Sequence, residues 1–381
     1  MKLVVFSPYL NHHQVPLADE LYRLLGAQFV FVATRKHDAS QLKGGKDYTN
    51  RPYCLCAAES SDQYERAMEL LMDADVALIS GGELEYEIAR AKTNKLTFEV
   101  SERWLKRGWI NLFSPTIFKS FLAYWRYFHH KPIYKLCCSA FATNDHYKLG
   151  TYRGRCFKWG YFTRVDSDYN LEAQELGASC AKITPIMWCA RFLKLKHPEL
   201  AVQLAKRLKD VGYSFILDMY GSGEELENNK ALAQNLDVTD VVKFHGALPN
   251  EEILEQMKRH EIFLFTSDSN EGWGAVANEA MSQGCVLVGS DAIGSIPYLI
   301  RDGENGCIFR SMDCDSLYEK VKWLLDNAEK RKRLSENAKY DMLNVWSPAV
   351  AARNLLTLIS DIQAGKESSI QEGPGSKATP I

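Results

Sequence analysis

The sequence lacks the apolar run that a membrane-spanning helix needs, because no stretch of about twenty consecutive residues is apolar. It also lacks an excess of either charge. Its 46 Lys and Arg residues nearly balance 48 Asp and Glu residues, for a net charge of −2, which gives no general attraction to nucleic acid. The first residues, MKLVVFSPYL, lack the length and cleavage site of a signal peptide and are expected to form a strand. These absences favour a cytoplasmic protein that does not bind nucleic acid.

The ten cysteines do not form the paired spacing of a metal site. Cys54 and Cys56 are too close together for a usual zinc pair, and no second pair accompanies them. Most of the others lie in apolar, strand-like runs, which is typical of buried free thiols in a reducing compartment (Cys137, Cys138, Cys189, Cys285 and Cys307). We therefore expect neither a bound metal nor a disulfide.

With 381 residues, the chain is long enough for two domains. Short apolar runs of strand length alternate with helical stretches, which predicts an α/β fold with doubly wound parallel sheets. We expect a first domain over residues 1–165, a polar linker over 166–180 and a second domain over 181–345. A helix over 346–363 and a disordered tail over 364–381 complete the prediction, because the tail shows no periodicity.

Residues 266–284, TSDSNEGWGAVANEAMSQG, are the most informative stretch. The apolar run 262–265 predicts a strand, Gly272 and Gly274 permit tight turns, and a helix is expected from Ala275 until Gly284 ends it. The N-terminus of such a helix attracts phosphate. Carboxylates eight residues apart, Glu271 and Glu279, are good acceptors for sugar hydroxyls. A ligand with central phosphates and hydroxyl-rich ends fits this pattern, as in a nucleotide sugar.

At these residues the sequence resembles the retaining glycosyltransferases of family 4, which have the GT-B fold of two Rossmann-like domains facing a cleft. The resemblance rests on Glu271-Gly272-Trp273-Gly274 followed by Glu279-Ala280-Met281, which matches the family's Glu-x7-Glu signature. It implies that Glu271 and the backbone from Gly272 to Ala275 bind the donor sugar, with Trp273 in this loop, and that Glu279 binds the ribose. It also implies a UDP-sugar as donor substrate, with no cofactor and no metal.

The resemblance extends to residues 190–246. Arg191 and Lys196 have the spacing of the family's pair that binds the donor diphosphate, where fixed cations stabilise the charge that grows as the glycosidic bond breaks. Gly221 and Phe244 match positions beside the nucleotide and its base. Gly221-Ser222-Gly223 lacks the third glycine of a dinucleotide fingerprint, which disfavours a nicotinamide-dependent oxidoreductase. Two DxD sequences, 166–168 and 313–315, are interpreted as linker and helix start rather than metal ligands.

The first domain departs from the family pattern. Its first loop, with Asn11, His12 and His13, has no paired glycines, so we expect only a loop beside the acceptor and cleft. Many members have a histidine just past the strand end where this chain has Ser101-Glu102-Arg103. That histidine is absent here, and Glu102 or Arg103 is the candidate replacement, orienting the acceptor hydroxyl. A glutamate that merely starts a helix is the alternative for Glu102.

Residues 104–135 combine basic and aromatic side chains without an acidic residue. From 117 to 128 the apolar positions follow helical spacing, so the segment could lie in a membrane interface and bind anionic lipid on the inner face of the membrane. A helix that packs on the core with a solvated basic face is the alternative.

The sequence thus predicts a retaining hexosyltransferase that uses a nucleotide-sugar donor and a saccharide or lipid-linked acceptor in polysaccharide or glycolipid synthesis. A sugar-nucleotide epimerase of the same architecture and a noncatalytic nucleotide-sugar binding protein are the alternatives.

Overall fold

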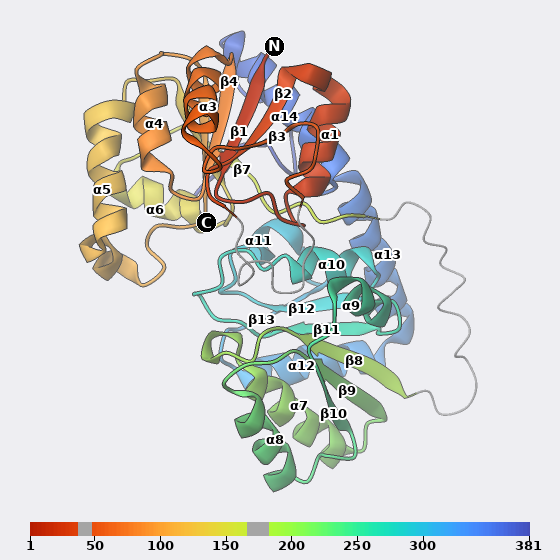
Figure 1. Ribbon diagram of the computed structural model, residues 1–381. Coiled ribbons are helices and arrows are strands. Elements are labelled where there is room, and N and C mark those ends of the chain that lie inside the picture. The colour runs from red at the N-terminus through yellow and green to blue at the C-terminus, as the bar shows by residue number, and fades with distance from the viewer. Residues whose placement is uncertain (37–47, 166–182) are drawn as a thin grey trace. The chain divides into compact units, whose positions relative to one another are not determined.

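The computed structural model describes residues 1–36, 48–165 and 183–381 (Figure 1). The chain forms two compact units. Unit 1 consists of Met1–Arg164 together with Val345–Ile381, and unit 2 consists of Val165–Asn344. The predicted linker 166–180, including the DxD at 166–168, lies outside the described residues. Each unit contains one parallel sheet, as the alternation of apolar runs and helical stretches predicts.

Unit 1 is built on a seven-stranded sheet with the order β3-β2-β1-β4-β5-β6-β7, in which every pair of neighbours is parallel. Its elements are β1 (Leu3–Ser7), α1 (Val15–Leu25), η1 (Gly26–Gln28), β2 (Phe29–Ala33), β3 (Cys54–Cys56), α3 (Ser61–Asp73), β4 (Val76–Ser80), α4 (Leu84–Ala91), β5 (Thr97–Ser101), η2 (Gly108–Phe113), α5 (Pro115–Ala123), the π-helical turn η3 (Tyr124–Phe128), β6 (Ile133–Cys137), α6 (Ala142–Leu149), β7 (Cys156–Lys158) and α14 (Pro348–Gln363).

The two faces of the unit 1 sheet follow from the alternation of side chains along each strand. Val4, Phe6, Val32, Ala77 and Ile79 point to the face where α3 and α4 pack, and they form an apolar cluster there. The opposite face carries α1, and α14 packs against α1, so the last long helix belongs to unit 1 (Figure 1). This second face receives the alternate residues, which are Leu3, Val5 and Ser7 on β1 and Phe29 and Phe31 on β2.

Unit 2 contains a six-stranded sheet with the order β10-β9-β8-β11-β12-β13, also parallel throughout. The strands β11 and β12 are buried along their whole length, which explains their continuous apolar sequences. The elements are β8 (Thr184–Cys189), η5 (Lys194–Lys196), α7 (Pro198–Val211), β9 (Phe215–Tyr220), α8 (Leu226–Asn235), β10 (Val242–Gly246), α9 (Asn250–Met257), β11 (Ile262–Phe265), α10 (Val276–Ser282), β12 (Val286–Ser290), α11 (Ile296–Leu299), β13 (Cys307–Phe309), α12 (Cys314–Asp326) and α13 (Ala328–Asn344).

The C-terminal residues 364–381 are ordered, and the expectation of a disordered tail is wrong. The tail runs antiparallel beside β7: the N–H of Lys158 donates to the carbonyl of Ser376 at 2.8 Å, and the N–H of Ala378 donates to the carbonyl of Cys156 at 3.0 Å. Gly375 also donates to Lys158, at 2.8 Å. Backbone pairing and burial at the sheet edge supply the order, and neither leaves a hydrophobic period in the sequence.

The segment 104–135 contributes to the core with one side only. Within the apolar cluster that includes Tyr124 and Phe128, the partly buried Ile117 and Phe121 pack on one flank. In α5 itself only Ala123 is buried. The other side leaves large apolar side chains exposed, so the segment is not simply a core helix.

Candidate active site

Two loops of unit 2 are held together where β8 and β11 end. Thr266, which follows β11, accepts a hydrogen bond from the indole N–H of Trp188 at 2.9 Å and donates one to the carbonyl of Lys196 at 2.6 Å. The N–H of Asp268 donates to the carbonyl of Leu195 at 3.0 Å. Because β8 and β11 are parallel neighbours, their following loops meet at the same edge of the sheet.

This loop contact brings Lys196 and Glu271 together across 75 residues of sequence. Lys196 Nζ and Glu271 Oε2 form an ion pair in which each side chain is 13% exposed, and Ser267 Oγ donates to the same carboxylate oxygen at 3.1 Å. Partial burial strengthens such contacts because water screens them less. The pair places one cation and one carboxylate side by side, each able to exchange its partner for a group on a ligand.

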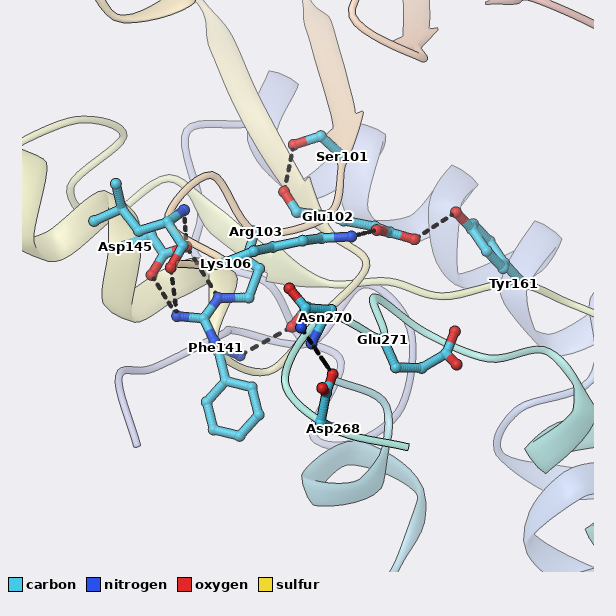
Figure 2. A network of polar contacts seen from close by, with 12 residues as sticks. Ser101, Glu102, Arg103, Lys106, Phe141, Asp145, Tyr161, Asp268, Asn270 and Glu271 are labelled. Carbon is cyan, nitrogen blue, oxygen red and sulfur yellow. Dashed lines mark hydrogen bonds and ion pairs between the residues drawn. The ribbon is translucent and has the colours of Figure 1, made fainter. Parts of the chain in front are cut away.

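The residues between Asp268 and Glu271 form a tight, internally bonded turn. Asp268 accepts hydrogen bonds from the backbone N–H and the amide of Asn270, at 2.8 and 3.0 Å, and the N–H of Glu271 donates to its carbonyl at 3.1 Å (Figure 2). His197 lies near both Glu199 (2.7 Å) and Asp268 (3.3 Å). The hydrogen bond with Glu199 is the main cause that raises the pKa of His197. The turn thus fixes the direction of the Glu271 side chain.

Trp273 and Gly274 serve the structure of the loop. The Trp273 side chain is fully buried; its indole N–H donates to Asn278 at 2.8 Å, and its carbonyl accepts from the Ser295 hydroxyl at 2.5 Å. Gly274 has φ +74°, and a Cβ there would lie 2.2 Å from the Phe265 ring. The Gly-Trp-Gly sequence therefore anchors the turn before α10, and contacts to a donor from this stretch would be made by its backbone.

Glu279 lies in α10 and is 7% exposed. Its Oε1 accepts a hydrogen bond from the side-chain amide of Asn250 at 3.0 Å. Burial raises the pKa of Glu279 from about 4.5 to about 7, although the Asn250 hydrogen bond opposes that shift. The carboxyl group therefore titrates near neutral pH, and it already accepts one hydrogen bond, from Asn250.

The other predicted donor residues occupy the same edge of the unit 2 sheet. Arg191 follows β8, and its side chain is exposed. Gly221 follows β9 with φ +133°, and a Cβ there would lie 1.9 Å from the carbonyl oxygen of Ala190. Only glycine lets these two loops cross, so Gly221 has a structural reason independent of any ligand. Phe244, on β10, packs at the margin of the core, with its ring centroid 6.2 Å from that of Phe192.

In unit 1 the loop after β1 carries the predicted acceptor residues. The N–H of His13 donates to Asn11 Oδ1 at 3.0 Å, and the Gln14 amide donates to the hydroxyl of Ser7, at the end of β1, at 2.7 Å. The rings of His12 and His13 have centroids 3.7 Å apart. Burial, with a smaller contribution from His12, lowers the pKa of His13 to about 3. His13 is therefore neutral at neutral pH and presents a hydrogen-bonding imidazole rather than a cation.

Glu102 directly follows β5 and stands between two partners in unit 1. Its Oε1 accepts a hydrogen bond from Tyr161 at 3.0 Å, and its Oε2 forms an ion pair with Lys106 at 2.6 Å (Figure 2). The Tyr161 ring is nearly parallel to that of His13, with centroids 6.4 Å apart. Asn11, His13 and Glu102 line the same cavity of unit 1. The loops after β1 and β5 therefore bring together Asn11, His13 and Glu102, whereas His12 does not line this cavity.

Arg103 points away from this group and toward Asp145 of α6 (Figure 2). Its guanidinium donates to both oxygens of Asp145, at 3.3 and 3.2 Å, and that carboxylate also accepts the N–H of Leu105 at 2.7 Å. Asp145 is fully buried, so the bidentate pair fixes the loop after β5. These contacts favour a positioning role for Arg103 over contact with an acceptor.

Sequence reasoning did not identify several partners of the site residues. Asn250, Ser267, Lys106, Tyr161 and Asp145 belong to no motif in the chain. The partners of Asn250, Tyr161 and Asp145 lie 29 to 59 residues away. Lys106 and Ser267 are the exceptions, because each lies only four residues from the carboxylate that it contacts, Glu102 and Glu271 respectively.

Comparison with known proteins finds a family resemblance in the second part of the chain. Residues 185–341 match the family model described as glycosyl transferases group 1. The D-inositol 3-phosphate glycosyltransferase of Corynebacterium aurimucosum is 26% identical over 182 residues, which are 46% of this chain and 42% of that protein. The lipopolysaccharide core biosynthesis glycosyltransferase LpsE of Rhizobium meliloti is 26% identical over 208 residues, 53% of this chain and 59% of that protein. The chain thus spans about half the length of these relatives.

The fold has solved counterparts. The Anabaena protein Alr3699/HepE, crystallised in complex with UDP, superposes with a TM-score of 0.69 at 14% identity, over 94% of this chain and 100% of that one. Its complex with UDP-glucose gives a TM-score of 0.65 at 14% identity, over 94% and 99%. Identities this low establish the fold alone: two Rossmann-like domains of the GT-B type.

Proposed function

We propose that the chain transfers a hexose-type sugar from a nucleoside diphosphate sugar to an acceptor hydroxyl, because residues 185–341 match the group 1 glycosyl transferase model and the fold is of the GT-B type. The observation that carries the proposal is the partly buried ion pair of Lys196 and Glu271, which is followed eight residues after Glu271 by the buried Glu279 of α10. A cation for a diphosphate and two acceptors for hydroxyl groups therefore occur within the matched domain.

In the proposed reaction each of these side chains has a separate task. Lys196, with Arg191, stabilises the negative charge that develops on the departing diphosphate. Glu271 accepts hydrogen bonds from the donor sugar, and Glu279 accepts them from the ribose. Donor binding would replace the Lys196–Glu271 contact with two contacts to the ligand. Each charged hydrogen bond contributes about 1.5–3 kcal/mol.

We further propose that the transfer retains the anomeric configuration and uses UDP as the nucleotide. Retention by a glycosidase-type route needs a carboxylate nucleophile beside the anomeric carbon. The role proposed for Glu271 is hydroxyl binding, so the leaving diphosphate itself would help to deprotonate the acceptor on the same face, as is thought for the family that the chain resembles. The similar solved structures of Alr3699/HepE contain UDP and UDP-glucose, which supports UDP over other nucleotides.

The test begins with thermal-shift screening of the full chain against UDP, GDP, ADP and their sugars. Transfer is then measured with the stabilising donor and a panel of saccharide acceptors, and NMR of the product reports the anomeric configuration. Glu271→Ala should lower kcat/KM about ten- to a hundredfold in a protein that still folds, with some decrease in Tm because the partly buried Lys196 loses its anion. Glu255→Ala is the matched control because Glu255 is an exposed glutamate of the same unit. Epimerised donor formed without acceptor would instead identify an epimerase, and normal turnover by Glu271→Ala would refute its role.

A second proposal concerns the membrane. Among the described residues, no helix is long and apolar enough to cross a bilayer. The segment 106–127 nevertheless exposes large apolar side chains beside basic ones, and we propose that it binds the surface of an anionic membrane, where a lipid-linked acceptor would be found. The exposed apolar residues are Trp109, Ile110, Phe113, Phe118, Leu122, Trp125 and Tyr127, and the basic ones are Lys106, Arg107, Lys119 and Arg126.

Vesicle sedimentation tests this proposal. The full chain should bind vesicles of phosphatidylglycerol and phosphatidylcholine, bind less at high salt, and bind neutral vesicles poorly. The double variant Trp109→Ser/Phe113→Ser should lose at least tenfold in affinity, because both side chains are more than half exposed and burial of each contributes about 1.5–3 kcal/mol. Tyr340→Ser removes an exposed aromatic ring from unit 2 and should bind normally. Equal binding by all three proteins would contradict the proposal.

A further inference from the structure

Unit 1 contains a cavity of about 420 Å³ on the face of its sheet that carries α1. Most of its lining is apolar, and its polar lining residues gather where the strands end. The apolar members include Val5, Leu17, Ala18, Leu21, Phe31 and Leu78. The polar members include Ser7, Asn11, His13, Ser80, Glu102 and Tyr161.

The register of the sheet explains why the cavity has two different ends. Ser7 ends β1 and Ser80 ends β4, while Val5 and Leu78 lie two residues earlier and are paired with each other. A step of two residues keeps the side chain on the same face. The same face therefore changes from hydroxyl groups at the strand ends to apolar side chains one row deeper, where Phe31 is paired with Val5.

The polar end coincides with the predicted acceptor residues. Asn11, His13 and Glu102 line it, and Glu102 is held by Tyr161 at 3.0 Å and Lys106 at 2.6 Å. Gln14, which also lines the cavity, is bonded to Ser7 at 2.7 Å. These contacts fix the polar groups before any ligand arrives, which lowers the entropic cost of binding.

The size of the cavity limits its occupant. An engineered apolar cavity of about 150 Å³ holds one benzene ring, so this one, nearly three times larger, accommodates a ring with substituents or a short alkyl chain. Small-molecule sites typically combine such an apolar volume with a few fixed polar groups.

We propose that this cavity takes the apolar part of the acceptor, an aromatic ring or a short alkyl chain, while the polar head of the acceptor lies at the serine, histidine and glutamate end. This inference rests on the proposed glycosyl transfer and narrows its acceptor class. The acceptor is then an amphipathic hydroxyl compound rather than a free sugar.

Alkyl glucosides from methyl to hexyl, kept below micelle-forming concentrations, test the inference by calorimetric binding to the full chain without donor. Affinity should rise about fourfold with each methylene until the cavity is filled, in line with about 0.8 kcal/mol per buried CH₂. Ala18→Phe puts a ring into the cavity and should abolish the dependence on chain length. Ala27→Phe adds the same ring at an exposed position after α1 and should retain it.

Leu17→Ala enlarges the cavity without adding bulk, so its affinity should keep rising to a longer chain, which keeps the test decisive even if Ala18→Phe fails to fold. Affinity independent of chain length in the parent protein, or unchanged by both Ala18→Phe and Leu17→Ala, overturns the inference.

UDP-sugar turnover is measured in parallel. Transfer to free sugars without chain-length dependence would leave the proposed function standing and remove the cavity's role. Chain-length dependence without turnover of any nucleotide sugar would refute the transferase and leave an apolar ligand site.

Discussion

Lys196→Met is the substitution that best separates catalysis from structure at the Lys196–Glu271 pair. Methionine keeps much of the length of the lysine side chain but removes its charge. Lys196 is 13% exposed and contacts Glu271 directly. The variant therefore loses a cation for the leaving diphosphate and leaves a partly buried carboxylate with the Ser267 hydroxyl at 3.1 Å as a remaining partner.

The expected catalytic loss follows from charge development in the transition state. Removing one fixed electrostatic contact to a developing anion typically costs about 2.7–4 kcal/mol, or 10²–10³ in rate. The effect should appear mainly in kcat, since the charge on the diphosphate is greatest as the glycosidic bond breaks. Arg191 remains in place, so we expect the lower part of this range.

The stability effect has a different pattern. Leaving Glu271 without its cation should cost about 1–3 kcal/mol, which corresponds to a decrease in Tm of about 3–10 °C for a domain of this size. Adding Glu271→Gln removes the unpaired charge. The double variant should therefore recover part of the lost stability while its activity stays as low as that of Lys196→Met or falls further.

Initial rates of UDP release in the presence of acceptor measure the first effect, and thermal unfolding measures the second. Lys194→Met is the matched control, because Lys194 lies two residues away and is exposed; it should leave both quantities nearly unchanged. A kcat/KM for Lys196→Met within threefold of the parent would refute the proposed role of this cation. If activity and stability both recover in the double variant, the Lys196–Glu271 pair stabilises the fold and has no separate role in catalysis.

Three further predictions concern other parts of the chain. Gly274→Ala should lower the free energy of unfolding by at least 1–3 kcal/mol and abolish turnover, because φ is +74° and the added Cβ meets Phe265 at 2.2 Å; a normal Tm would contradict this account of the loop. Burial raises the pKa of Glu279 to about 7, so the folded state keeps this proton to higher pH than the unfolded state does. The free energy of unfolding should therefore fall by about 2–3 kcal/mol as the pH rises from about 4.5 to 7. Urea titrations should show that Glu279→Gln flattens this pH dependence, and an equal dependence in both proteins would exclude Glu279 as its source. Deleting residues 366–381 removes three backbone hydrogen bonds to β7 and should lower the calorimetric Tm of unit 1 by several degrees, whereas an unchanged Tm would show that the tail adds no stability.

Much of the fold was predictable because its elements have strong local signals. The helix α1 begins at Val15 and ends at Leu25, as the apolar period, Pro16 and Gly26 indicate. The strand β11 matches the apolar run 262–265. The strand β3, three residues long, was missed because its order comes from pairing with β2. The tail was missed for the same reason, since composition does not report backbone pairing with a distant strand.

The site was only partly predictable. Lys196 and Glu271 could be selected because a family signature marks both, and the structure shows them in contact. Tyr161 could not, because its hydroxyl reaches Glu102 from a segment 59 residues away. Arg103 looked equivalent to its neighbour in the sequence, but the direction of its side chain depends on a buried aspartate in α6. Tertiary packing determines the directions of these side chains, and short-range sequence patterns do not report it.

The division of unit 1 between Met1–Arg164 and Val345–Ile381 has a consequence for the order of folding. On the ribosome, the first segment emerges early but must wait for α14, which packs on α1, until residues 348–363 have been made. Unit 2 is continuous in sequence and can fold during that interval. The later-encoded domain is thus expected to mature first, and the nascent first segment is the part of this protein most in need of chaperone protection.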